Sequence, residues 1–207
     1  AGVWGIEADI RFTADLVPVI CHDPTAERVF GQSLCVAELS FEQLRQSVPL
    51  IPSLAELIAA FGGNTHLMLE IKDEPRPDAP RQKEHLASLL SSLTPGRDFH
   101  VLALDPALFN MVDFLPPESL LPVAELNTDV MSRAALTGEW SGLAGHYLLL
   151  TRRLMQEHAG RQQLIGTGFP SSRNCLFREL NRGVEWVFSN DAVKLQRIRD
   201  EYLARAA

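Results

Sequence analysis

The stretch GIEADIR, at positions 5–11, alternates polar and apolar side chains with the period of a β-strand. It predicts a strand over 6–12, in which Glu7 and Asp9 share one face and the apolar side chains between them share the other. Carboxylates on an otherwise apolar strand add nothing to packing, so folding gives no reason for them. We therefore expect this pair to serve chemistry.

Short apolar runs alternate with helical patterns along the rest of the chain, which predicts an α/β protein with a parallel sheet. The first two strands are separated only by a short turn, so they are expected to form a hairpin. The expected strands cover 6–12, 17–21, 66–72, 99–104, 120–126, 142–150, 163–169 and 184–189. The expected helices cover 41–47, 53–61, 81–93, 128–136, 152–158, 171–181 and 191–204.

The arrangement of polar residues favours a (β/α)8 TIM barrel. No dinucleotide fingerprint or P-loop glycine pattern is present, which counts against the nucleotide-binding doubly wound folds. Polar residues stand instead at the carboxyl ends of several strands, where such a barrel keeps its active site. Seven of the eight strand–helix units are visible when the hairpin is taken as one unit, and we expect residues 1–207 to form a single domain.

The bulk composition is that of an ordinary globular protein, with 46% hydrophobic and 22% charged residues among 207. The net charge of −7 argues against nucleic acid or an anionic membrane as the main partner. No apolar run approaches the roughly 20 residues that span a bilayer, so stable membrane insertion is not expected. Three cysteines without motif spacing indicate reduced thiols and a cytoplasmic protein, although a Cys21–Cys35 bridge in a secreted protein stays open.

Two further polar clusters end predicted strands. His22 and Asp23 follow the second strand, and Glu70 and Lys72 share a face at the end of the third. Since the carboxyl ends of barrel strands converge, we expect the carboxylate of Glu70 to meet those of the first strand.

Three carboxylates that meet in a partly buried site repel one another, so they hold either protons or a cation. Ligands that are all oxygen favour a hard ion, Mg2+ or Ca2+, over zinc. Lys72 would add a fixed positive charge for an anionic group, and His22 is a candidate general acid or base, with an unperturbed pKa of about 6.5. This inventory suits phosphoryl chemistry.

Each polar cluster taken alone has a simpler interpretation, as a solvated strand face, a structural pair or a surface ion pair. The position of all three on predicted strands or strand ends favours a site. Among the other polar residues, His66, His100 and His146 are assigned structural roles, and His85 and His158 are assigned to helix surfaces. Glu125 and Asn127 end a predicted strand and have about even odds of lining the barrel mouth.

The chain resembles the glycerophosphodiester phosphodiesterase family. The segment GIEADIRFTADLVPVICHD, at 5–23, is similar to that family's Glu-x-Asp, Thr-x-Asp-Gly-x-Pro-Val and His-Asp pattern, and Arg28 and Gly31 fit the residues that usually come next in the family. IPSL at 51–54 and LEIK at 69–72 are similar to its helix start and its Glu-Ile-Lys strand. GVEWVFSN at 183–190 is similar to its closing strand.

The resemblance implies a TIM-barrel, metal-dependent phosphodiesterase that cleaves small-molecule glycerophosphodiesters to glycerol 3-phosphate and an alcohol. It implies that Glu7, Asp9 and Glu70 bind the cation, that His22 is one of two catalytic histidines, and that Lys72 contacts the phosphate or the metal shell. The sequence predicts no oligomeric state, headgroup or choice between the two cations.

The chain departs from the family pattern at its start. The family's first strand carries a His-Arg-Gly motif that the sequence lacks, so we expect an N-terminally incomplete domain whose first strand lies upstream of Ala1. One alternative is a non-catalytic phosphate- or metal-binding domain that has lost this motif. A second is a lipid-cleaving phospholipase D relative of the same superfamily, which the Glu-Ile-Lys strand disfavours. Asn190 also stands where the closing strand usually has an aspartate.

Overall fold

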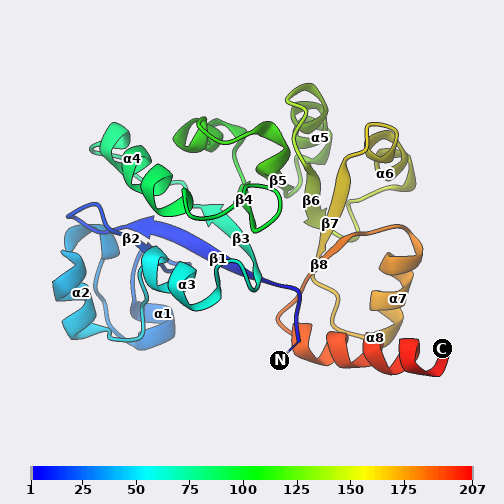
Figure 1. Cartoon of the computed structure of the whole chain (residues 1–207), viewed down its shortest axis with the longest axis horizontal. Helices are drawn as coiled ribbons and strands as arrows, with labels where there is room; N and C mark the ends of the chain where they lie inside the picture. Colours follow the sequence, from blue (N-terminus) through cyan, green and yellow to red (C-terminus); the bar gives the residue numbers. More distant parts are fainter. Residues whose placement is uncertain (1, 207) are drawn as a thin grey trace. The chain divides into compact units, whose positions relative to one another are not determined.

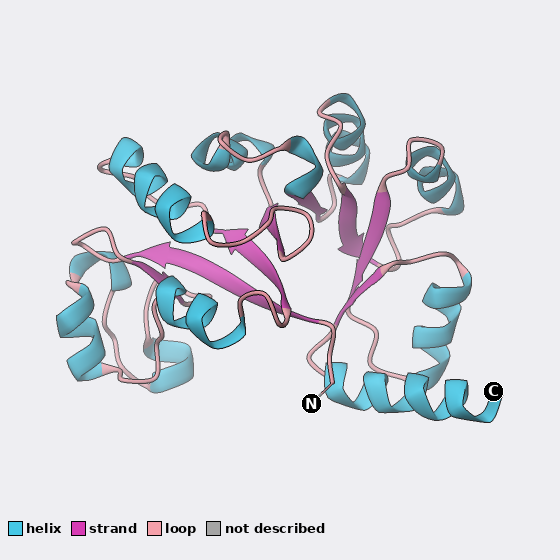
Figure 2. Cartoon of the chain, viewed as in Figure 1, coloured by secondary structure: helices cyan, strands magenta, loops and turns pink. Residues whose placement is uncertain are grey.

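The computed structural model describes residues 2–206. Contacts divide the chain into two compact units, one formed by residues 5–116 and the other by the chain from Pro117 onward with the segment before Gly5. Strands alternate with helices along the chain in both units (Figure 2). The α/β class is therefore confirmed, whereas the prediction of a single, N-terminally incomplete domain stays a prediction.

The unit of residues 5–116 has four strands in the order β2-β1-β3-β4 (Figure 1). β1 pairs antiparallel with β2, as the predicted hairpin requires, and parallel with β3, which pairs parallel with β4. The elements, with η for a 3-10 helix, are β1 (Gly5–Phe12), β2 (Pro18–Ile20), α1 (Glu27–Phe30), η1 (Val36–Glu38), α2 (Phe41–Ser47), α3 (Leu54–Phe61), β3 (His66–Ile71), α4 (Ala79–Leu90), β4 (Phe99–Ala103) and η2 (Pro106–Val112).

The other unit has four parallel strands in the order β5-β6-β7-β8. Its strand β6 ends at His146 and not at the predicted position 150, because the chain turns there and the Leu149 N–H donates to the His146 carbonyl. The elements are η3 (Pro117–Ser119), β5 (Leu120–Ala124), α5 (Thr128–Thr137), β6 (Gly142–His146), α6 (Arg152–Ala159), β7 (Leu164–Gly168), α7 (Arg173–Asn181), β8 (Trp186–Phe188) and α8 (Ala192–Ala206).

Capping boxes fix where α2 and α3 begin. The hydroxyl of Ser40 accepts from the Gln43 N–H, and the Gln43 side chain accepts from the Ser40 N–H. Ser53 and Glu56 repeat this exchange at the start of α3. Each box satisfies two backbone groups that a helix end would otherwise leave unpaired, so both helix starts follow from the sequence.

An apolar cluster packs β2 and the segment after it against α2. Val19, Cys21 and Leu44 are all buried in this cluster. The chain leaves the core immediately after Cys21, which puts His22 at the surface of this unit. Cys21, Cys35 and Cys175 are all free thiols. Within residues 2–206, no helix combines the length and apolar character that crossing a bilayer requires.

The assignment of His158 to a helix surface is wrong. His158 is fully buried, with Nδ1 2.8 Å from Gln163 Oε1 and Nε2 2.9 Å from Ser132 Oγ. His85 is half-buried, and its Nδ1 lies 2.8 Å from the carbonyl oxygen of Leu16. Both imidazoles join structural elements. The structural assignment of His66 and His100 agrees with their burial and mutual contact of 2.8 Å.

Candidate active site

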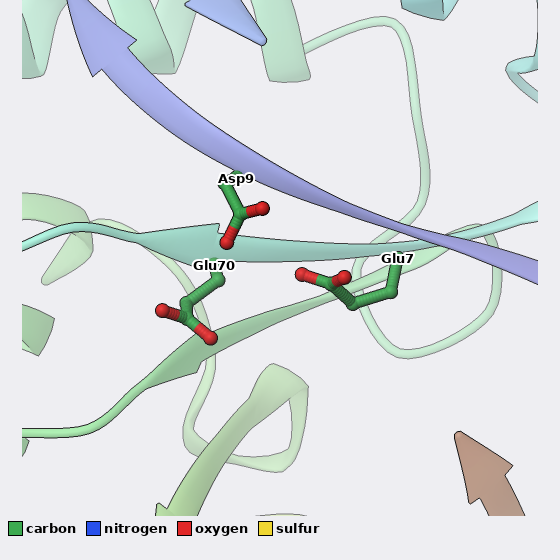
Figure 3. Close-up of side chains that lie close together, drawn as sticks. All are labelled: Glu7, Asp9 and Glu70. Carbon is green, nitrogen blue, oxygen red and sulfur yellow. The ribbon is translucent and has the colours of Figure 1, made fainter. Parts of the chain in front are cut away.

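Three carboxylates from two neighbouring strands come together in the unit of residues 5–116 (Figure 3). Glu7 and Asp9 belong to β1 and Glu70 to β3, and one oxygen from each lies within 4.8 Å of the others. The register explains the meeting, since Asp9 is the direct Cα partner of Glu70 and Glu7 is the partner of Met68. The side-chain period of two then directs all three carboxylates to the same face of the sheet. The predicted ligand set is thus brought together.

Lys72 places its ammonium against two of these carboxylates. Its Nζ is 2.7 Å from Asp9 Oδ1 and also forms an ion pair with Glu70 Oε1. All three side chains are at most 14% exposed. Burial alone would lower the pKa of Lys72, but hydrogen bonds to Asp9 and Glu70 outweigh it and raise the pKa. Lys72 is therefore charged at neutral pH.

Glu7 shows that the cluster lacks positive charge. Its side chain reaches solvent, yet the protein around it removes part of its hydration. That desolvation, followed by repulsion from Asp9 and Glu70, raises the pKa of Glu7 to about 7, against a smaller opposing effect of Lys72. A bound cation would relieve this repulsion, and an all-oxygen donor set fits a hard divalent ion. The residues present therefore fit the cation that the sequence predicts.

His22 lies in the loop between β2 and α1, next to Asp23. Its Nδ1 is 2.7 Å from Asp23 Oδ1, and Asp23 Oδ2 is 2.5 Å from Nε of Arg28. Hydrogen bonds from Arg28, and then from His22, lower the pKa of Asp23 to about 2. Among the described residues, His22 Nε2 has no hydrogen-bond partner, and the side chain is 62% exposed. No described contact joins its ring to the carboxylate cluster.

Arg11 and Glu74 connect the His22 segment to β1, and neither is among the candidate residues that the sequence suggests. Arg11 lies on the same face of β1 as Asp9, and its Nε and Nη2 donate to the backbone oxygen of His22. Its Nη1 is 2.9 Å from Glu74 Oε2, and both side chains are 9% exposed. Continuing the alternation of Glu7 and Asp9 by two residues would have found Arg11. Nothing in the loop sequence indicated Glu74.

A second arginine follows β3. Arg76 Nη2 donates to the backbone oxygen of Lys72 at 2.6 Å. Its Nη1 is buried and has no hydrogen-bond partner among the described residues, and burial lowers the pKa of the group. Glu125 and Asn127 belong to the other unit, where the Glu125 N–H donates to Asn127 Oδ1 at 3.0 Å. Their role in a barrel mouth stays a prediction.

The comparison with known sequences points to one family. The glycerophosphoryl diester phosphodiesterase family matches residues 1–139. Bovine glycerophosphodiester phosphodiesterase 1 is 32% identical over 85 residues, covering 34% of this chain and 26% of that protein. The rat protein of the same name is 46% identical over 48 residues, covering 23% and 14%. The matched segments thus span about a quarter or less of these relatives.

Solved structures share the fold at low sequence identity. A glycerophosphodiester phosphodiesterase from Thermotoga maritima superposes with a TM-score of 0.78 at 14% identity, over 94% of this chain and 86% of that one. An Oleispira antarctica phosphodiesterase in complex with its product sn-glycerol-3-phosphate gives 0.79 at 18% identity, over 96% and 86%. This likeness confirms the TIM-barrel fold class.

The family match extends over more than half of the residues and includes every proposed ligand position. The chain therefore belongs to the glycerophosphoryl diester phosphodiesterase family.

Proposed function

We propose that this chain carries the cation site and one catalytic histidine of an enzyme that hydrolyses glycerophosphodiesters to glycerol 3-phosphate and an alcohol. The observation that carries the proposal is the convergence of the Glu7, Asp9 and Glu70 oxygens within 4.8 Å. Family membership supports it, and so does the product bound to the Oleispira antarctica enzyme of the same fold.

Glu7, Asp9 and Glu70 would hold a divalent cation, Mg2+ or Ca2+. When bound, such an ion supplies Lewis-acid polarisation of a phosphate oxygen. With a pKa of about 7, the carboxyl of Glu7 is partly protonated at neutral pH. This proton would leave as the ion binds, because carboxylates must ionise to act as ligands.

Lys72 would neutralise the anionic diester. Its ammonium already lies against Asp9 and Glu70, so a phosphate drawn to the cation would meet a second positive charge beside it. A fixed charge of this kind stabilises the transition state when it faces the oxygens on which charge develops.

His22 would move a proton at Nε2. Asp23 is ionised because its pKa is low, so it holds the Nδ1 of His22 and orients the ring. A carboxylate in this position also stabilises the imidazolium that forms when Nε2 takes a proton. His22 can therefore serve the attacking or the leaving oxygen, with a second group serving the other.

The test measures release of glycerol 3-phosphate from glycerophosphocholine by the full gene product, with EDTA or with added Mg2+ or Ca2+. Activity should require the cation and be lost in Glu70→Ala. Glu42→Ala is a matched control, because Glu42 is exposed on α2 and its carboxylate accepts a hydrogen bond from Gln46 on the same helix. Retained activity in Glu70→Ala would sink the metal assignment. Cation binding without turnover would favour the non-catalytic alternative.

A further inference from the structure

We propose that Arg11 is a positioning residue that fixes the main chain of His22 relative to the carboxylate cluster, with Glu74 holding the guanidinium in place. The inference rests on the proposed function, since it assigns a role to a residue that is neither a proposed cation ligand nor a proposed proton-transfer group. It concerns only the unit of residues 5–116.

The first support is the geometry of the guanidinium. Arg11 Nε and Nη2 donate to the single backbone oxygen of His22 at 3.1 and 2.9 Å. Two donors of one planar guanidinium that converge on one acceptor fix the direction of the group as well as its distance. An ammonium offers a point charge and cannot reproduce this constraint.

Glu74 supplies the second support. Its Oε2 accepts from Arg11 Nη1 at 2.9 Å, and its Oε1 accepts from the backbone N–H of Phe12 at 3.0 Å. The carboxylate is thus bound at both oxygens and ties the loop that follows Lys72 to the end of β1. One ion pair consequently connects the segments that carry His22 and Lys72.

The third support is that β1 holds the His22 segment at a second point. The Cys21 N–H donates to the backbone oxygen of Asp9 at 2.9 Å. Asp9 presents its carboxylate to the cluster, so the same residue anchors the cation ligands and the chain before His22. Arg11 then anchors the chain after it. Since the His22 side chain is 62% exposed, few side-chain contacts restrain it, and these main-chain anchors limit its position together with the Nδ1 contact to Asp23.

A purely structural role explains the arrangement less well. Removing two charges from water is costly, and a buried ion pair can often be replaced by apolar residues with no loss of stability. Stability alone therefore gives no strong reason for a buried Arg11–Glu74 pair. The need to hold a proton-transfer group in a fixed place does give such a reason, because a misplacement of about 1 Å can lower the rate roughly a hundredfold.

The experiment compares Arg11→Lys and Glu74→Gln with Arg97→Lys in the full gene product. Arg97 is a matched control, because its side chain is 74% exposed and pairs with the neighbouring Asp98. Three measurements are made: steady-state kinetics give kcat and KM for glycerophosphocholine, calorimetry gives the Kd for Ca2+, and NMR gives the imidazole 15N and 1H shifts of His22, assigned with His22→Gln. If Arg11→Lys does not fold, Glu74→Gln decides, since it keeps the size of the side chain and its acceptor for Phe12.

We expect kcat to fall about tenfold in Arg11→Lys, with KM and the Kd for Ca2+ within about twofold of wild type. The His22 ring signals should move in both site variants and not in Arg97→Lys. Unchanged kcat and unchanged ring signals in the folded variants would overturn the inference, as would a parallel loss of Ca2+ affinity. If wild type shows no turnover, the proposed function fails, and the ring signals still decide on positioning.

Discussion

The ammonium of Lys72 lies 2.7 Å from the carboxylate of Asp9, across the boundary between two parallel strands. Lys72 also pairs with Glu70, so one positive charge faces two of the three proposed cation ligands. The two roles that the sequence predicts for these residues, binding a cation and binding a phosphate, would therefore be coupled through shared carboxylates.

This coupling predicts that Lys72→Met separates cation binding from turnover. Removing the ammonium leaves Asp9 and Glu70 more negative, so the affinity for Ca2+ should stay the same or rise. The substrate loses a positive charge, so kcat/KM should fall about a hundredfold. Calorimetry and steady-state kinetics check the two halves. Lys83→Met is the control, because Lys83 pairs with Asp113 away from the cluster. A joint loss of Ca2+ affinity and activity would contradict this prediction.

The raised pKa of Glu7 predicts that protons compete with the cation. Between pH 8 and pH 6 a carboxyl with a pKa of about 7 passes from mostly ionised to mostly protonated. The Kd for Ca2+ should therefore be about tenfold weaker at pH 6 than at pH 8, with close to one proton released per ion bound at pH 6. Calorimetry in buffers of different ionisation enthalpy measures both quantities. Glu7→Gln should bind more weakly and lose this pH dependence; a variant that keeps the wild-type slope would show that another group titrates.

Because His158 is buried, we expect the free energy of unfolding to fall in acid. Burial lowers the pKa of His158 in the folded state, while in the unfolded chain it returns to about 6.5. Below that pH the unfolded state binds a proton that the folded state refuses, so the free energy of unfolding falls as the pH falls. One such proton contributes up to about 1.4 kcal/mol per pH unit.

Urea unfolding between pH 5 and pH 7.5 measures the effect of His158. His158→Gln should lower the stability at pH 7.5 and show a shallower decline in acid than wild type. His85→Gln, at a half-buried histidine with one backbone contact, is the comparison. Equal slopes in wild type and His158→Gln would assign the acid sensitivity to other groups, of which His66 is the first candidate because burial lowers its pKa too.

Replacing Glu179 should lower the stability of the protein and leave the proposed cation site unchanged. Its fully buried carboxylate pairs with Arg178 and Arg182, and Arg182 also donates to the backbone oxygen of Leu150. Glu179→Ala removes the acceptor that these two guanidinium groups share and leaves a gap in the core, so stability should fall by about 2 kcal/mol. The Kd for Ca2+ should not change, since all three ligands belong to the other unit. Chemical unfolding and calorimetry check the two statements, and a weakened Ca2+ site in the folded variant would contradict the second.

The proposed cation ligands could be predicted because two simple rules bring them together, the alternation of side chains along a strand and the pairing of parallel strands. The alternation along β1 sets Glu7 and Asp9 on one face, and parallel pairing then brings Glu70 to Asp9. The contact of Glu74 with Arg11 could not be predicted, because Glu74 lies in a loop with no period to fix its direction. The short helix α1 was not predicted either, because its four residues are too few to show a helical pattern.

The burial of His158 did have a signal in the sequence. Leu154 and Met155 are buried on α6, and His158 follows them by four and three residues, on the same face of the helix. The polarity of histidine led to a surface assignment. The contacts with Ser132 and Gln163 that make its burial possible come from other elements and carry no local sequence signal.

Glu7, Asp9 and Glu70 should together bind one divalent cation. The most direct measurement is an anomalous difference map from crystals of the protein soaked in Mn2+, which takes the same oxygen ligands as Mg2+. We predict a single strong peak at about 2.0–2.5 Å from one oxygen of each carboxylate, absent from crystals of Glu70→Ala. A peak elsewhere, with these three side chains unliganded at saturating Mn2+, would contradict the account.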